Sequence, residues 1–329
     1  MSGTDSGTFA RRFTFRPFDG IRRGRVYRLC AISWYWWTHQ WKRSRAAKIL
    51  MVILIFFFIL TNLLLFSFIE MKQVDSDLSN IEIFEGVLLQ LVRGVVSFQT
   101  EFYGSGEGSE SIMMTFGGLS LFILAFMVMI GSGLIADDIS NNTLEIYFSK
   151  LERHEYIIGK FGAFVIFGNI TLTLPFFLEF FLLFIGIGGI DLVQSLPILI
   201  DVIIITELII FTFASIFLAF SAVTNKLYAG AVAYMLLFIS NIIIPPLAFV
   251  SKGEVGLVIL LDILTVLLIS SYIIVGTTDL HYISGREFYD LNLASGQGLE
   301  SWIVLGALGI YFMIGFLVVI LTVYWKHRK

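Results

Sequence analysis

Seven long hydrophobic runs alternate with polar segments along the chain. They lie at about residues 49–69, 113–136, 157–189, 197–223, 228–250, 256–275 and 302–325. Each has at least the length of about 20 apolar residues that an α-helix needs to cross the hydrocarbon core of a bilayer. The pattern therefore predicts an all-α, polytopic membrane protein whose transmembrane domain covers residues 49–329.

The charges that flank these runs set the predicted orientation. Eleven Lys and Arg residues precede the first run and three more follow the last, which places both termini in the cytoplasm by the positive-inside rule. The loop 70–112 instead carries eight acidic residues against two basic ones, so we expect it to be external. Two cytoplasmic termini require an even number of crossings, and one of the seven runs therefore does not cross fully.

The run 256–275 is the best candidate for the incomplete crossing. It contains Asp262, and the stretch that follows carries four acidic residues against one arginine. We therefore predict six transmembrane helices, with residues 251–301 forming a re-entrant or surface-lying element on the outer side before the last span. Irregular backbone at membrane depth has to be covered by protein or water. Seven full crossings, which would place the C-terminus outside, are the alternative.

The cytoplasmic N-terminus, residues 1–48, contains a stretch with the pattern of an amphipathic helix. Basic residues interleave with an apolar and aromatic side formed by Val26, Leu29, Cys30, Ser33 or Trp34, Trp37 and Trp41. Such a helix lies in the membrane interface, with its tryptophans at the level of the lipid headgroups. We therefore predict an interfacial helix in contact with membrane lipids.

Composition agrees with a membrane protein and narrows the chemistry. Hydrophobic residues make up 57% of the chain and charged residues 14%, against about 25% charged in ordinary soluble domains. No G-x-x-x-x-G-K-[ST] phosphate-binding loop occurs, and no histidine stands at metal-ligand spacing from cysteine or acidic residues. We expect no cofactor, no metal site and no nucleic-acid partner for this chain.

Two acidic residues fall inside predicted spans, Glu179 and Glu207. Ionisable groups at that depth usually face a bundle interior or water, which makes substrate contact or proton coupling one hypothesis for them. A structural hydrogen bond to a neighbouring helix is the other. If these carboxylates couple ion movement, the protein would be an ATP-independent secondary transporter; a membrane scaffold without transport is a third possibility.

The most polar interruption is the loop 137–156, predicted to be cytoplasmic between the second and third spans. Asn142 followed by Glu145 matches a capping pattern and predicts the start of a short helix. Helical spacing then gathers four residues on one apolar face, Leu144, Tyr147, Phe148 and Leu151. A helix this short needs tertiary packing, either against the membrane and neighbouring cytoplasmic ends or in a groove of a separate protein with aromatic anchors.

The stretch GLIADDISNNTLEIYFSKLERHEYIIGK, residues 133–160, resembles the permease subunits of type 2 ATP-binding-cassette (ABC) exporters. In that family a small-residue and acidic stretch ends the second span, followed by Thr-Leu-Glu, a coupling helix and an R-x-E-Y-I-x-G-K start of the third span. The matching positions are Gly133, Ala136, Asp137, Asp138, Thr143, Leu144, Glu145, Arg153, Glu155, Tyr156, Ile157, Gly159 and Lys160. The family usually has a basic residue and a glycine where this chain has Ile139 and Asn142, and FSKLER lacks its common proline.

The resemblance implies a six-span permease of the plasma membrane with an N-terminal elbow helix. It implies a second permease as partner, identical or related, and two copies of an ABC ATPase subunit that hold ATP and Mg. The permease itself is then a non-catalytic subunit. The family's coupling helix, which docks on the ATPase, corresponds to Thr143, Leu144, Glu145, Tyr147, Phe148 and Leu151. The transported substrate is not indicated.

Overall fold

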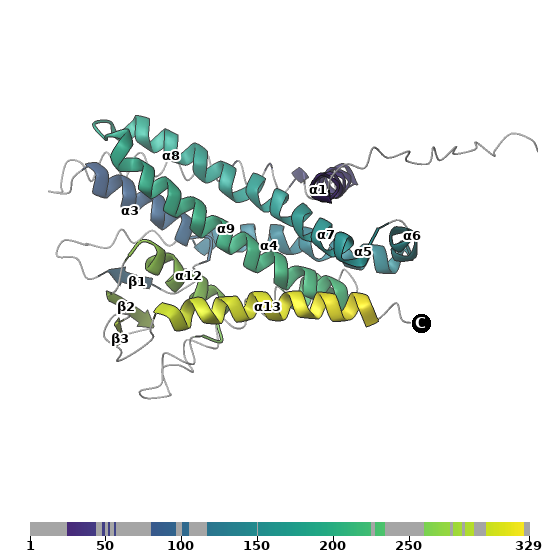
Figure 1. The fold of residues 1–329 in the computed structure, drawn as a ribbon. Helices are drawn as coiled ribbons and strands as arrows, with labels where there is room; N and C mark the ends of the chain where they lie inside the picture. Colours follow the sequence, from purple (N-terminus) through teal and green to yellow (C-terminus); the bar gives the residue numbers. More distant parts are fainter. Residues whose placement is uncertain are drawn as a thin grey trace, which may run out of the picture.

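A computed structural model describes most of the helical part of the chain. The described residues are 25–43, 48–49, 52, 56, 80–96, 101–104, 117–149, 151–224, 228–233, 260–276, 279–284, 287–292 and 301–325. Within them, long helices run side by side and a small sheet lies at one end of the bundle (Figure 1).

The elements follow one another along the chain as helices with three short strands. The helices are α1 (Arg25–Arg43), α3 (Asn80–Arg93), α4 (Gly117–Gly131), α5 (Gly133–Ser140), α6 (Leu144–Phe148), α7 (Arg153–Gly168), the π-helical turn η1 (Asn169–Thr173), α8 (Leu174–Ile187), α9 (Leu192–Val223), α12 (Ile263–Ile274) and α13 (Ser301–Trp325). The strands are β1 (Glu101–Gly104), β2 (Asp279–Ser284) and β3 (Glu287–Asn292).

Four stretches of the described chain are long and apolar enough to cross a membrane. They are Ile123–Ser140, Arg153–Ile187, Leu192–Val223 and Ser301–Trp325, and they coincide with four of the predicted spans. Most residues of the predicted spans 49–69 and 228–250 lie outside the described residues. The chain is thus a polytopic membrane protein, as predicted, and the total of six spans stays a prediction.

The run predicted not to cross contains the short helix α12. Its 12 residues rise about 18 Å, well below the roughly 30 Å of a hydrocarbon core. Asp262 caps its N-terminus, because the carboxylate accepts hydrogen bonds from the Leu264 amide and the Thr265 hydroxyl. Residues 263–272 are all buried. Helix α12 is therefore packed inside the bundle, and the predicted incomplete crossing on the outer side stays a prediction.

A three-stranded antiparallel sheet amends the all-α prediction. Strand β2 pairs with β1 on one side, with Tyr103 opposite His281, and with β3 on the other, with Tyr282 opposite Tyr289. The sheet joins the loop 70–112 to the segment 251–301, the two regions predicted to be external. Strands of four to six residues carry too little periodicity to be recognised against turn-like surroundings, which is why the sequence did not predict them.

Helix α3 belongs to the same end of the bundle as the sheet (Figure 1). It packs against α8 and α9, with the rings of Phe84 and Phe180 5.3 Å apart in an edge-to-face arrangement. The Asn80 side-chain amide donates a hydrogen bond to the Gly188 carbonyl in the turn between α8 and α9, at 3.3 Å. That turn is made by two glycines with positive φ, Gly188 and Gly189. The loop 70–112 thus contributes a packed helix to the bundle.

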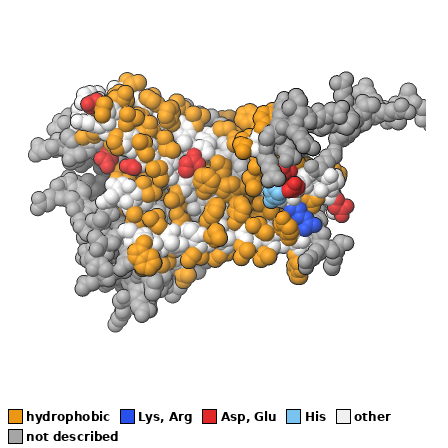
Figure 2. Space-filling model, viewed as in Figure 1, with side chains coloured by type: hydrophobic (Ala, Val, Ile, Leu, Met, Phe, Trp, Pro, Cys, Tyr) orange, Lys and Arg blue, Asp and Glu red, His pale blue; other side chains and the backbone are white. Residues whose placement is uncertain are grey.

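The opposite end of the bundle carries α1, α6 and the last turn of α13 (Figure 1). Between the two ends, hydrophobic side chains cover most of the face shown in Figure 2, and charged side chains are few. The exposed side chains of α8 and α13 in this middle zone are mainly Leu, Ile and Phe. This is the surface expected of helices that face lipid, with polar groups gathered toward the ends.

Candidate functional site

The polar loop between the second and third spans begins with a tight turn that ends α5. Asn142 has a φ of +54°, in the left-handed region. The Thr143 amide donates to the Asp138 carbonyl at 3.0 Å and the Asn142 amide to the Ile139 carbonyl at 3.2 Å, which is the pattern of a Schellman motif. Asn142 is therefore the residue that ends α5, and its predicted role as N-cap of the next helix is wrong; Thr143 takes that position.

This turn also explains a departure from the family pattern. A residue with positive φ is usually glycine, because a Cβ atom crowds the following carbonyl in that conformation. Asparagine is among the few other residues that adopt it readily. Asn142 can therefore fill the position of the family's glycine without changing the path of the backbone.

Helix α6 has the predicted apolar face, and the same chain covers that face. Leu144 is buried, and Tyr147 and Phe148 are half-buried. The Tyr147 ring lies 5.5 Å from the ring of Trp36 in α1, and the Phe148 ring lies 5.4 Å from that of Tyr156 in α7. Burial, followed by the nearby Asp138 carboxylate, raises the pKa of the Tyr147 phenol, which stays neutral at physiological pH.

The side of α6 that faces away from the bundle carries Glu145 and Ile146. Both are exposed, and Ile146 has 60% of its surface accessible. Leu151, the fourth residue of the predicted face, is half-buried just after the helix. Three of the four predicted face residues thus lie on α6, while its uncovered apolar side chain, Ile146, is one that the helical spacing left off that face.

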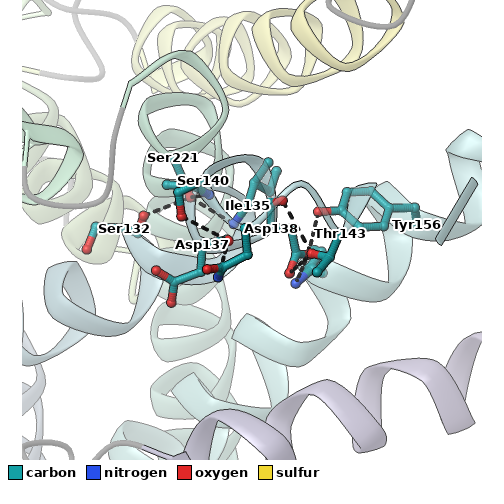
Figure 3. Close-up of polar contacts among 11 residues, drawn as sticks. Ser132, Ile135, Asp137, Asp138, Ser140, Thr143, Tyr156 and Ser221 are labelled. Atoms are coloured by element: carbon teal, nitrogen blue, oxygen red, sulfur yellow. Dashed lines mark hydrogen bonds and ion pairs between the residues drawn. The ribbon is translucent and has the colours of Figure 1, made fainter. Parts of the chain in front are cut away.

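Asp138 is the centre of the polar contacts at this end (Figure 3). Its Oδ2 atom lies 2.7 Å from Lys160 Nζ and accepts a hydrogen bond from the Tyr156 hydroxyl at 2.8 Å. The Thr143 hydroxyl lies 3.4 Å from Oδ1. Lys160 is only 3% exposed, and burial of an ammonium group is costly without a paired charge. One carboxylate therefore joins the end of α5, the start of α6 and the first turns of α7.

Trp36 extends this cluster to α1. Lys160 Nζ lies 4.1 Å from the centre of the Trp36 ring, within cation–π distance, and the Tyr156 ring lies 5.0 Å from it. Two glycines of α7 allow α1 to approach so closely. A Cβ atom at Gly159 would lie 2.5 Å from Ile32 Cγ2, and one at Gly162 would lie 2.4 Å from Ser33 Oγ. Helix α1 is thus docked on α7.

The packed side of α1 overlaps the predicted one only in part. Ser33 is buried as predicted and Trp36 is buried as well, whereas Cys30 and Val26 are exposed. Aromatic residues occupy positions 34 to 37 consecutively, so the sequence offered several equally apolar sides of this helix. The close approach at Gly159 selects the side that includes Trp36, and no feature of the helix itself reveals that choice.

The first turn of α7 is fixed by two further contacts. The Arg153 guanidinium lies 5.8 Å from the centre of the Phe148 ring and 5.0 Å from that of Tyr324 in α13. The Glu155 carboxylate accepts a hydrogen bond from the Glu152 amide at 3.3 Å, which satisfies a free N–H group at the helix start. The motif R-x-E-Y-I-x-G-K was noted in the sequence by resemblance alone. In the structure, its side chains connect α7 to neighbouring helices.

The two intramembrane acids lie on different helices. Glu179 in α8 is fully buried, and Glu207 in α9 is partly exposed with Asn169 and Thr173 of η1 beside its carboxyl group. Their predicted part in a transport pathway stays a prediction. Among the side chains that the structure describes, no three His, Cys, Asp or Glu residues gather as a metal site requires.

The geometry so far defines a polytopic membrane protein whose loop between two spans is folded into a small, firmly held helix at one end of the bundle. A family model described as "ABC-2 family transporter protein" matches residues 39–327. The chain belongs to this family, which confirms the resemblance noted in the sequence. It is therefore an ABC transporter permease, a membrane component that lacks a nucleotide-binding domain and works with an ABC ATPase subunit. A comparison with curated proteins gives no match.

Proposed function

We propose that this permease couples ATP hydrolysis by a separate ATPase subunit to the export of a substrate across the plasma membrane. The observation that supports this most strongly is the two-sided character of α6. One side of the helix is locked to α1 and α7, and the other presents Glu145 and Ile146 outward. A helix that receives movement from a partner needs both an exposed contact surface and a firm attachment to the spans.

The proposed docking surface is the outward side of α6, with the ATPase subunit as its occupant. Ile146 is an exposed β-branched side chain on a five-residue helix, and it would enter an apolar pocket of the ATPase. Glu145 beside it favours a basic residue at the rim of that pocket. In this arrangement the inner side of α6 is held against the bundle by four side chains, Leu144, Tyr147, Phe148 and Leu151. The Thr143 hydroxyl contacts Asp138 at the start of the helix.

The charge distribution supports a cytoplasmic location for the docking end. Basic residues dominate residues 1–48 and the four residues after α13, and α1, α6 and the end of α13 lie at one end of the bundle (Figure 1). Under the positive-inside rule this end faces the cytoplasm, where ATP is available. The sheet, α3 and α12 would then face outward. A second permease, identical or related, and two ATPase subunits would complete the transporter.

The test is recruitment of the cognate ABC ATPase to the full-length permease in lipid nanodiscs. Ile146→Ala should weaken ATPase binding about 10-fold or more, since full burial of an isoleucine is worth about 1.5–3 kcal/mol, and Ile146→Asp should weaken it further. The control is Ile185→Ala in α8, an isoleucine near the end of its helix that is even more exposed than Ile146. Unchanged ATPase binding by both Ile146 variants would overturn the proposed docking surface.

A further inference from the structure

The second span is interrupted at Ser132, where α4 ends and α5 begins. The hydroxyl of Ser221, a fully buried residue of α9, enters this interruption. It donates a hydrogen bond to the Ser132 carbonyl at 2.8 Å and accepts bonds from the amides of Ile135 and Ala136, both at 2.9 Å (Figure 3). A side chain 85 residues or more away in the chain thus completes the backbone hydrogen bonding of a transmembrane helix.

Because of these contacts, the same backbone amides and carbonyl of the second span can form their hydrogen bonds in two ways. In an uninterrupted α-helix, the Ile135 and Ala136 amides would donate to the carbonyls of Gly131 and Ser132. In this structure Ser221 serves as partner to both amides and to the Ser132 carbonyl. Insertion of a side chain into the helical hydrogen-bond series is a recognised origin of helix bending. Because both amides and the Ser132 carbonyl have partners in either arrangement, the free energies of the two differ by only a few hydrogen bonds.

The interruption separates two parts of the molecule that are each firmly held. Toward the bundle, a Cβ atom at Gly131 would lie 2.6 Å from Phe217 Cβ and 2.8 Å from the Phe164 ring, so α4 is in close contact with α9 and α7. Toward the loop, the Schellman turn and the Asp138 cluster join α5 to α6 and α7. Along the second span, residues 131–136 are the backbone that lies between these two sets of contacts.

We infer that the Ser132–Ser221 contact is a hinge through which a displacement of α6 tilts α5 relative to α4. The inference rests on the proposed function, since the ATPase supplies the displacement. Ser221 acts as a positioning residue: its hydroxyl holds the second span in the interrupted arrangement and touches no substrate. Without that hydroxyl, the amides of Ile135 and Ala136 have partners only if the span closes its own hydrogen bonds and straightens.

The test measures the distance between spin labels at Ser140, at the end of α5, and Val223, at the end of α9. Both positions are exposed, and the exposed Cys30 is first replaced by serine. Distances are recorded for the full-length permease in nanodiscs, alone and with its ABC ATPase trapped by ATP and vanadate. The wild-type chain should show a second distance on trapping. In Ser221→Ala the population at that distance should fall about 10-fold, the effect of one net hydrogen bond.

Two further variants make the result specific to the hinge. Ser215→Ala removes another buried hydroxyl of α9, one that bonds to the Thr212 carbonyl of its own helix at 2.8 Å, and should leave the trapped distance unchanged. Ser221→Thr keeps the hydroxyl and should restore the second distance. A normal shift in Ser221→Ala, or an equal loss in Ser215→Ala, would overturn the hinge while ATPase binding upholds the proposed function. A wild-type permease that binds no ATPase would overturn both.

Discussion

The two ends of this bundle are held together by different kinds of contact. At the docking end, Asp138 of α5 forms a largely buried cluster of charged and hydroxyl groups with Tyr156 and Lys160 of α7. At the sheet end, packing is apolar, as between Phe84 and Phe180, and the polar contacts are mostly caps and bonds to backbone carbonyls. Charge-assisted contacts fix distance and direction, whereas apolar packing tolerates sliding.

This difference in the type of contact suits the function proposed for the docking end. Movement delivered at α6 reaches the spans only if the joint between them does not yield, and directional contacts provide that stiffness. The sheet end makes corresponding contacts too, such as the hydrogen bond from the Tyr311 hydroxyl to the Leu260 carbonyl at 2.7 Å. This bond and the one from Asn80 to the Gly188 carbonyl each join a side chain to a single backbone group. The effects of substitutions at the two ends should therefore differ both in the property that changes and in the size of the change.

The largest effect is expected for Asp138→Ala. It leaves the buried Lys160 without its paired charge, and breaking a buried ion pair in this way costs about 3–5 kcal/mol. The free energy of unfolding, measured by denaturant titration in bicelles, should fall by that amount. The double variant with Lys160→Met removes the uncompensated charge and should recover part of the loss. An equal loss in the single and double variants would show that the ion pair does not stabilise the docking end.

A comparable destabilisation at the sheet end should leave ATPase recruitment intact. Phe84→Ala removes a fully buried ring from the contact of α3 with α8, with an expected loss of about 3 kcal/mol or more. Binding of the ATPase, measured at a temperature where the variant stays folded, should match that of the unmodified chain. Loss of binding would mean that the two ends are energetically coupled, and it would contradict the distinction between them.

The smallest effect concerns the turn that ends α5. Asn142→Ala places a side chain with a poor left-handed preference at a φ of +54°, and should lower the free energy of unfolding by about 1 kcal/mol. Asn142→Gly, which restores the glycine usual in the family, should change it by only a few tenths of a kcal/mol. A larger loss in the glycine variant than in the alanine variant would show that the asparagine side chain has a role beyond backbone conformation.

Much of the fold was accessible from the hydrophobic pattern. Four predicted spans coincide with long apolar helices of the structure, and the hydrophobic run that contains Asp262 includes the apolar helix α12. The apolar face of α6 was predicted residue by residue from helical spacing. These features depend on residues close together in sequence. The length of a hydrophobic run and the helical period of its residues therefore predict them directly.

Other features were not accessible because they depend on contacts between distant segments. The sheet pairs residues 101–104 with residues 280–283, and neither segment signals a strand by itself. The partners of Lys160 outside its own helix, Asp138 and Trp36, come from two other elements, α5 and α1. Asn142 was predicted to cap α6, because a capping pattern in sequence does not distinguish the start of one helix from the end of the preceding one.

The sequence by itself determined that this chain crosses a membrane several times and carries a polar segment with a short helix between two of its spans. It did so because hydrophobic length and helical period are local properties. Only the tertiary structure decided which side of that segment is available to a partner. The rings of Trp36 and Tyr156 cover one side and leave Ile146 exposed, and Ser221 of a distant helix completes the hydrogen bonding of the second span.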